Sequence, residues 1–253
     1  MRRETQNVLL VLVGGALLKI AINGSYLRYV KPSTRPTIIA AGVVMIVLAV
    51  LAIVRDIRAH RARAVPDHDH TDHDHTDHDH QHGNRVSWLL VLPVLALFLI
   101  APPALGADAV TRADSGTVAG RATPAVVQQG AAAFPPLPAG TVVPLSVSEF
   151  VTRSVWDSTG SLNNRAVRLT GFVVHEGPST YLARLVITCC AADATPLKVR
   201  LLGDGAAALP DDQWVNVDGV IRPGSATTRN DYTPDLTVRA LTPIAAPADP
   251  YEY

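Results

Sequence analysis

Disulfide bonds, an excess of charge and the common catalytic motifs are all missing from this sequence. Its 253 residues include two cysteines, and these are neighbours, Cys189 and Cys190. Adjacent cysteines can bridge only through a strained ring, so a disulfide framework is excluded and the thiols are either free or metal ligands. Lys and Arg together number 22, as do Asp and Glu. With no overall basic field to attract nucleic acid, we expect no nucleic-acid partner.

Motifs for nucleophilic or nucleotide-dependent chemistry are also missing. The sequence contains no G-x-S-x-G, no phosphate-binding loop, no dinucleotide-binding glycine pattern and no H-E-x-x-H zinc motif. We therefore predict that the protein is not an enzyme, and we assign no catalytic residue.

Three apolar stretches are long enough to cross a bilayer, which takes about 20 helical residues. They are Val8–Leu27, Ile38–Val54 and Val86–Leu105, and the last two carry no charged residue. Lys19 interrupts the first stretch, and we expect its side chain to snorkel towards the membrane surface. We predict two transmembrane helices within residues 1–58 and a third at residues 86–106.

The positively charged flanks of these stretches predict their orientation, since Lys and Arg concentrate in short cytoplasmic loops. One side of the membrane would hold three such residues, Arg28, Lys31 and Arg35. The other side would hold seven, namely Arg2, Arg3, Arg55, Arg58, Arg61, Arg63 and Arg85. We predict a multi-pass protein of the cytoplasmic membrane. Its N-terminus and second loop, residues 59–85, would be cytoplasmic, and its C-terminal domain would be extracytoplasmic.

Two of these segments have an alternative interpretation as cleaved signals. The first stretch follows Met1-Arg2-Arg3, as in a secretory signal peptide, but no small-residue cleavage site follows it. The third stretch ends close to Ala107 and Ala109, whose spacing resembles a signal peptidase site. Cleavage there would release the distal domain, and this is the minor alternative.

The second loop contains a His/Asp tract, residues 67–82, in which the unit D-H-D-H-T recurs. Imidazole and carboxylate groups are ligands for zinc, copper and nickel, and so dense a run can bind metal without a fold. Without fixed geometry the binding should be weak and unselective. The alternatives are a solvated spacer and a pH-responsive segment, because histidine titrates near neutrality. The predicted metal ligands are His68, His70, His73, His75, His78, His80, His82, Asp67, Asp69, Asp72, Asp74, Asp77 and Asp79.

The remainder of the chain predicts a linker followed by a β-domain. Residues 107–141 are rich in Ala, Pro and Gly and offer little to bury, which indicates an extended linker. Residues 142–253 form the predicted extracytoplasmic β-barrel domain. At its start, apolar residues at helical spacing predict a short amphipathic helix within Leu145–Trp156.

Five short β-rich runs follow this helix, separated by turn signals. Two runs carry a central glycine, Gly171 or Gly219, of the kind that marks a bend or a bulge. The pattern fits an OB-like five-stranded barrel, so the predicted fold class is membrane α, with three transmembrane helices, plus a small all-β C-terminal domain. The predicted strands are Ala166–His175, Tyr181–Cys190, Leu197–Leu202, Trp214–Ile221 and Leu236–Leu241.

The cysteine pair ends the second predicted strand. Side chains alternate across a strand, so Cys189 and Cys190 should point to opposite faces unless the backbone bends. One thiol could pack in the core, while the other could form a soft metal or metalloid site with Asp193, with or without His175. The alternative is that both cysteines are buried and only pack the strand. The possible thiol site therefore consists of Cys189, Cys190 and Asp193.

Two segments of the sequence resemble one bacterial membrane family. They are Gly24–Pro32 (GSYLRYVKP), between the first two apolar stretches, and Thr188–Ala194 (TCCAADA), in the distal domain. Members of this uncharacterised family are described as permease subunits, and they are typically encoded beside a predicted multi-span permease. The resemblance implies membrane spans followed by a β-domain, an accessory role in transport, and Cys189, Cys190 and Asp193 as family-specific positions. The His/Asp tract is not part of the family motif.

The leading hypothesis is an accessory membrane subunit of a permease for a divalent metal or metalloid ion. Zinc or another weakly bound divalent metal is the expected cofactor, concentrated by the His/Asp tract at the inner face. The predicted partners are the bilayer and a multi-span permease subunit. Two alternatives stay open. One is an envelope protein that binds protein or glycan, with the tract as a solvated spacer, and the other is a thiol redox sensor that uses the cysteine pair.

Overall fold

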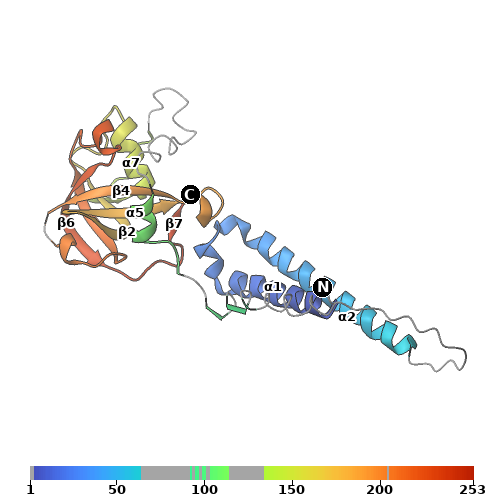
Figure 1. The fold of residues 1–253 in the computed structure, drawn as a ribbon. Coiled ribbons are helices and arrows are strands. Elements are labelled where there is room, and N and C mark those ends of the chain that lie inside the picture. The colour runs from blue at the N-terminus through green and yellow to red at the C-terminus, as the bar shows by residue number, and fades with distance from the viewer. Residues whose placement is uncertain are drawn as a thin grey trace, which may run out of the picture. The chain divides into compact units, whose positions relative to one another are not determined.

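The structure is a computed structural model that describes residues 3–63, 92, 95–96, 99–100, 103–113, 134–203 and 205–253. The chain divides into two compact units. One consists of Met1–Tyr26 and Pro32–Pro103, and the other consists of Leu27–Lys31 and Ala104–Tyr253 (Figure 1). The predicted His/Asp tract, most of the predicted third span and most of the predicted linker lie outside the described residues.

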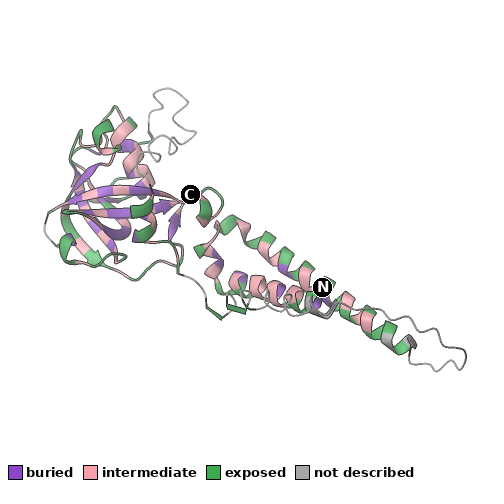
Figure 2. Ribbon diagram, viewed as in Figure 1, coloured by how far each residue is buried: buried purple, intermediate pink, exposed green. Residues whose placement is uncertain are grey.

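The first unit contains two apolar helices, α1 (Arg3–Asn23) and α2 (Arg35–Arg63). Short 3-10 turns η1 (Ser25–Arg28) and η2 (Pro32–Thr34) lie between them in the sequence. Two segments, Gln6–Asn23 and Pro32–Ala59, are long and apolar enough to cross a membrane. Only 17% and 11% of these segments is buried, which is too little for core helices of a water-soluble domain (Figure 2). A signal sequence near the N-terminus meets the same criterion.

Glycines bring α1 and α2 into close contact. A Cβ atom added to Gly14 would lie 3.0 Å from the carbonyl oxygen of Gly42, and one added to Gly42 would lie 2.9 Å from Leu18 Cγ. Small residues at such crossings let two apolar helices approach backbone to backbone. The two helices therefore form a tightly packed hairpin.

The second unit is built around one seven-stranded sheet. The strand order is β1-β2-β5-β6-β4-β3-β7, with β2 also paired to β3, so the pairings run in a cycle through β2, β5, β6, β4 and β3. Short 3-10 turns are η5 (Ala191–Asp193), η6 (Ala206–Ala208) and η7 (Thr228–Asn230). The longer elements are, in chain order, α5 (Ala107–Arg112), β1 (Val142–Pro144), α7 (Val147–Trp156), β2 (Ala166–Glu176), β3 (Ser179–Val186), β4 (Thr195–Leu202), β5 (Trp214–Ile221), β6 (Asp235–Pro243) and β7 (Tyr251–Glu252).

The predicted helix and all five predicted strands are present. Strand β5 has the predicted bounds, and β2, β4 and β6 differ from the predictions by one or two residues at their ends. Strand β3 ends at Val186 instead of Cys190, and the very short strands β1 and β7 were not predicted. The described residues thus confirm a helical N-terminal part and a C-terminal β-sheet part.

The two predicted bend glycines lie where neighbouring strands come close. A Cβ atom on Gly171 in β2 would lie 2.5 Å from the carbonyl oxygen of Ala183, and one on Gly219 in β5 would lie 2.6 Å from that of Thr237. The register between β5 and β6 also shifts at Asp218 and Gly219, as at a bulge. A side chain at either position would strike backbone, so both positions require glycine. The register shift confirms the predicted bulge at Gly219.

Helix α7 packs its apolar side into the core of the sheet. Ser146 caps the helix, since its Oγ accepts a hydrogen bond from Glu149 N–H at 3.0 Å. Val147 and Phe150 are fully buried in the same cluster as Leu182 of β3. This amphipathic pattern, with polar residues outside, explains why a helix of only 10 residues is stable here.

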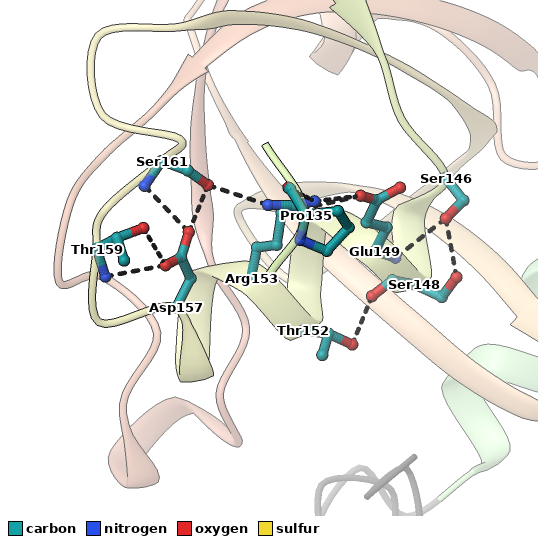
Figure 3. Close-up of polar contacts among 9 residues, drawn as sticks. All are labelled: Pro135, Ser146, Ser148, Glu149, Thr152, Arg153, Asp157, Thr159 and Ser161. Carbon is teal, nitrogen blue, oxygen red and sulfur yellow. Dashed lines mark hydrogen bonds and ion pairs between the residues drawn. The ribbon is translucent and has the colours of Figure 1, made fainter. Parts of the chain in front are cut away.

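A polar network holds the C-terminal end of α7 (Figure 3). The Asp157 carboxylate accepts hydrogen bonds from the backbone N–H and hydroxyl groups of both Thr159 and Ser161. The buried Arg153 side chain donates to Ser161 Oγ and to the carbonyl oxygen of Pro135. Burial would raise the pKa of Asp157, but the four hydrogen bonds outweigh it and lower the pKa to about 2.

Helix α5, at the start of the predicted linker, belongs to the β-sheet unit. Val110 is fully buried in a cluster with residues of β2 and β3, and Ala107 N–H donates to Asp212 Oδ1 at 2.6 Å. Ala107 and Ala109, the positions of the signal-peptidase-like spacing, therefore lie in a docked helix where Ala107 is only 5% exposed. Burial and backbone hydrogen bonding of this kind disfavour proteolysis in the folded chain.

Candidate functional site

The candidate site lies in the turn between β3 and β4. Strand β3 ends at Val186, Ile187 is still buried, and the backbone then leaves the sheet. The Asp193 carboxylate holds the turn, because its Oδ1 accepts from Thr188 N–H and its Oδ2 accepts from Cys189 N–H, each at 2.8 Å. Aspartate often fixes turns by accepting hydrogen bonds from nearby backbone groups. Asp193 thus shapes the segment that carries the cysteines.

The two thiols and the carboxylate converge on one point. The Sγ atoms of Cys189 and Cys190 are 3.6 Å apart, and the ligand atoms of these residues and Asp193 all lie within 4.8 Å of one another. Cys189 is exposed and Cys190 is half-buried. The thiols do not point to opposite faces, because β3 ends before them and the backbone bends, which is the exception that the prediction allowed. The alternative of buried, strand-packing cysteines is wrong.

The carboxylate disfavours ionisation of the neighbouring thiol. Hydrogen bonding to Asp193, and then to Cys190, raises the pKa of the Cys189 thiol to about 11. Burial would raise the pKa of Asp193, but hydrogen bonds from the Cys189 side chain and from backbone N–H groups lower that pKa overall. At neutral pH the group therefore consists of an ionised carboxylate beside a protonated thiol that is hydrogen-bonded to it, and a bound cation would replace the thiol proton in this interaction.

The separation of the sulfur atoms suits a tetrahedral ion. Zinc–thiolate bonds are about 2.3 Å long, so sulfur atoms 3.6 Å apart subtend an angle of about 100° at the ion. Tetrahedral coordination requires about 109°, whereas a linear ion with bonds of that length would need sulfur atoms about 4.6 Å apart. Cys189, Cys190 and Asp193 would supply three ligands. The exposure of Cys189 leaves a fourth position accessible from solvent.

The loop Leu27–Lys31, which lies between α1 and α2 in the sequence, packs against this turn within the second unit. Val30 forms an antiparallel β-bridge with Cys190. The N–H of Ala191 donates a hydrogen bond of 2.7 Å to the carbonyl oxygen of Tyr29. The backbone of the loop is thus hydrogen-bonded directly beside the thiols.

The C-terminal strand holds the same loop from another direction. The hydroxyl of Tyr251, in β7, donates to the carbonyl oxygen of Arg28 at 2.9 Å and accepts from Leu105 N–H at 3.2 Å. The Lys31 ammonium group lies 5.7 Å from the centre of the Tyr253 ring, within reach of a cation–π contact. The loop is therefore tied both to the thiol turn and to β7.

Among the described residues, one further predicted ligand, His175, does not join the group. His175 lies apart from it, with Nδ1 2.7 Å from Asp211 Oδ1 and its backbone N–H bonded to the same oxygen. Among the described residues, the group whose geometry could hold a metal ion contains only Cys189, Cys190 and Asp193. The tract of residues 67–82 lies outside the described part of the chain, so its role stays a prediction.

Sequence reasoning missed the loop Leu27–Lys31 as a neighbour of the site. The loop contributes main-chain groups, which every residue carries, so no residue type signals the contact. One signal could have found it. The two segments that resemble one family, Gly24–Pro32 and Thr188–Ala194, are the segments that meet here.

Comparison with solved structures gives a weak likeness. A protein provisionally named aspartyl-tRNA synthetase, from Leishmania major Friedlin, aligns with 47% of this chain and 25% of its own chain, at 10% sequence identity and a TM-score of 0.26. The match spans a quarter of that protein, and so low a TM-score carries no argument about fold or function. No curated protein matches the chain.

Two family profiles match the sequence. The DUF1980 N-terminal domain matches residues 6–114, which include both apolar helices and the loop between them. The DUF1980 C-terminal domain matches residues 150–253, which include the cysteine pair. The two matches cover most of the sequence and both segments that carry the family resemblance, and the chain belongs to the DUF1980 family.

Proposed function

We propose that the protein is an accessory membrane subunit that binds a thiophilic divalent ion of the zinc type and works with a multi-span permease. The observation that carries the proposal is the convergence of Cys189, Cys190 and Asp193, whose ligand atoms lie within 4.8 Å of one another. Thiolates and carboxylates are ordinary zinc ligands, and the ion replaces the thiol protons when it binds. Three protein ligands with an accessible fourth position favour an exchangeable ion over a closed structural one.

The electrostatics of the site favour ion binding over redox sensing. Redox-sensor cysteines have a low pKa and lie in electropositive surroundings. Here Asp193 raises the pKa of Cys189 to about 11, which suppresses the nucleophilic thiolate at neutral pH. The same carboxylate attracts a cation, so the redox sensor is the weaker candidate.

The contacts of the loop support a site close to the membrane surface. Asn23 ends α1, and an extended chain from there to Tyr29 spans roughly 20 Å at most. If α1 spans the bilayer, this short tether would hold Ala191, which donates a hydrogen bond to Tyr29, near the membrane surface. An ion bound at the adjacent thiols would therefore lie near the ends of the spans.

The same contacts support three spans instead of two. The loop between α1 and α2 packs with residues beyond Ala104, so both belong on one side of the membrane. The chain leaves α2 on the other side and must cross once more before Ala104. The uncharged stretch Val86–Leu105 is the segment suited to that crossing.

We further infer that the five central strands close into an OB-type barrel. The cycle of pairings through β2, β5, β6, β4 and β3 supports closure. All of these pairings are antiparallel except β4 with β6. A five-stranded barrel of mixed pairing, bent at Gly171 and Gly219, is the arrangement expected of this class.

The His/Asp tract would then lie on the cytoplasmic side, across the membrane from the thiol site. In this arrangement the tract concentrates the ion weakly at one face, while the fixed thiol site binds it more selectively at the other. A solvated spacer is the competing interpretation of the tract, and the titration described next separates the two.

Equilibrium zinc titration of the full chain in lipid nanodiscs tests the ion-binding proposal. We expect one tight site that is lost in the variant Cys189→Ser/Cys190→Ser, and a weak set that is lost when the seven tract histidines become serine. His175→Ser, outside the cluster, is the matched control and should bind zinc as the wild type does. A tight site that survives the double cysteine change would overturn the proposal. A weak set that survives loss of the tract histidines would favour the spacer.

Labelling of single introduced cysteines tests the topology, in a background without the two native thiols. Thr34→Cys, His75→Cys and Ser115→Cys place one thiol in each connecting segment. With a membrane-impermeant maleimide on intact spheroplasts, we expect positions 34 and 115 to react and position 75 to be protected. Equal behaviour of positions 75 and 115 would exclude the third span.

A further inference from the structure

The backbone at Cys190 takes part in two arrangements at once. Its thiol belongs to the ligand group, while its main chain forms a β-bridge with Val30 of the loop. Cys190 is extended, with φ −154° and ψ 168°, as a β-bridge requires. The next residue, Ala191, donates to Tyr29 at 2.7 Å. Asp193 thus fixes the turn on one side of the thiols, and the loop fixes it on the other.

We propose that the loop Leu27–Lys31 positions Cys190 for the ion, so that ion binding and loop docking strengthen each other. This inference rests on the ion-binding function proposed above. Metal ligands must hold their distances within a few tenths of an ångström, so a mobile backbone at Cys190 would have to be ordered when the ion binds. A loop that orders this residue beforehand improves ion affinity. Because coupling is reciprocal, the ion favours the docked loop by the same factor.

The coupling gives the two spans a direct connection to ion occupancy. The loop is joined covalently to α1 through Tyr26 and to α2 through Pro32. When the ion is bound, the loop is held against the thiol turn. When the ion is absent, the hydrogen bond from Ala191 and the contacts of β7 hold the loop alone. The loop that connects α1 and α2 would thus have two states, firmly docked with the ion bound and less firmly docked without it. A permease in contact with the two spans could respond to this difference.

The variant Ala191→Pro breaks the contact with Tyr29, since it removes the donor and places a ring carbon against the carbonyl oxygen, while the 3-10 turn itself can accept proline. Proline lacks an N–H group, so the hydrogen bond to the Tyr29 carbonyl is lost. Ala191 is the first residue of η5, where proline fits, and Cys190 already has the extended backbone that a residue before proline adopts. Ala191→Ser keeps the N–H group and is the matched control.

Two measurements test the coupling. Zinc affinity reports the effect of loop docking on ion binding, and trypsin cleavage after Arg28 reports the effect of the ion on loop docking. Lys31 precedes Pro32, which blocks trypsin, so the bond after Arg28 is the cleavage site in the loop. For the full chain in nanodiscs, we expect saturating zinc to slow this cleavage several-fold, while cleavage after the exposed Arg229 stays unchanged. Ala191→Pro should weaken zinc binding roughly three- to tenfold, about the effect of one hydrogen bond, and should reduce the protection by zinc.

The outcomes distinguish this inference from the proposed function. Zinc binding that needs both cysteines but leaves cleavage after Arg28 unchanged would overturn the coupling and leave the ion site intact. Zinc binding that is unchanged in Cys189→Ser/Cys190→Ser would overturn both. Tyr251→Phe, which removes the hydroxyl bonded to the Arg28 carbonyl, is a second variant and should also reduce the protection. Equal zinc affinity of Ala191→Pro and Ala191→Ser would overturn the positioning role.

Discussion

Two turns of the β-sheet unit are held by an aspartate in the same way, yet they differ in chemistry. Asp157 accepts hydrogen bonds from the backbone and hydroxyl groups of Thr159 and Ser161 (Figure 3). Asp193 accepts from backbone N–H groups in a similar geometry, but thiols lie beside it. Hydroxyl groups keep their protons and complete the first turn, whereas thiols can exchange theirs for a metal ion. The side chains around the carboxylate therefore separate a structural turn from a candidate ion site.

The sharpest test of this comparison makes the same substitution in both turns. Asp193→Asn removes a charged ligand and should weaken zinc binding roughly tenfold to a hundredfold. Asp157→Asn leaves the thiol turn untouched and should bind zinc as the wild type does. Isothermal titration of both full-length variants in nanodiscs measures the difference. Equal losses in the two variants would mean that Asp193 acts only on folding.

Thiol reactivity provides a second, smaller contrast. Because the pKa of Cys189 is raised to about 11, its alkylation by iodoacetamide should be slow at pH 8 and should keep accelerating towards pH 11. Asp193→Asn removes the negative charge, lowers this pKa and should speed the reaction at pH 8 roughly tenfold. Mass spectrometry that locates the label on Cys189 gives the rates, with Asp157→Asn as the control. Fast alkylation of the wild type at pH 7 would contradict the raised pKa and would favour the thiol redox sensor instead.

The third and smallest expected effect is that of Asp157 on the stability of the fold in acid. Its pKa is about 2 in the folded chain against an ordinary value of 3.8, so its contribution is complete above about pH 4 and is lost as the pH falls towards 2. We expect Asp157→Asn to cost about 1 kcal/mol of unfolding free energy at pH 7, since the group is half-buried near the surface of the domain, and to flatten the decline below pH 4. Urea unfolding between pH 7 and pH 2, followed by tryptophan fluorescence, measures both. A decline below pH 4 as steep as that of the wild type would contradict the assignment.

Elements with a clear hydrophobic period could be predicted from the sequence. Burial alternates strictly along β5, and its bounds match the apolar alternation of Trp214–Ile221. The amphipathic pattern located α7 equally well. Strands β1 and β7 have only three and two residues, too few for any period, and they pair with β2 and β3 across long stretches of chain. Their existence depends on the tertiary fold.

The residues of the candidate site could be predicted, but their geometry could not. Two cysteines followed by Asp193 suggested a thiol site by chemistry alone. Their common orientation depends on where β3 ends, and this is set by partners remote in sequence, such as Glu252, whose carbonyl accepts from Ile187 N–H at 3.0 Å. The apolar alternation that begins at Tyr181 does not indicate that β3 ends at Val186.

The hydrogen bond between Tyr251 and Arg28 joins residues 223 positions apart, which imposes an order on biogenesis. At about 5–20 residues per second, the ribosome takes on the order of 10–45 s to add the intervening chain. The hairpin of apolar helices is therefore made well before Tyr251, which anchors the loop between them, has been translated. Until Tyr251 has been added, the loop lacks one of its two anchors, and only the turn around Cys190 and Ala191 can hold it.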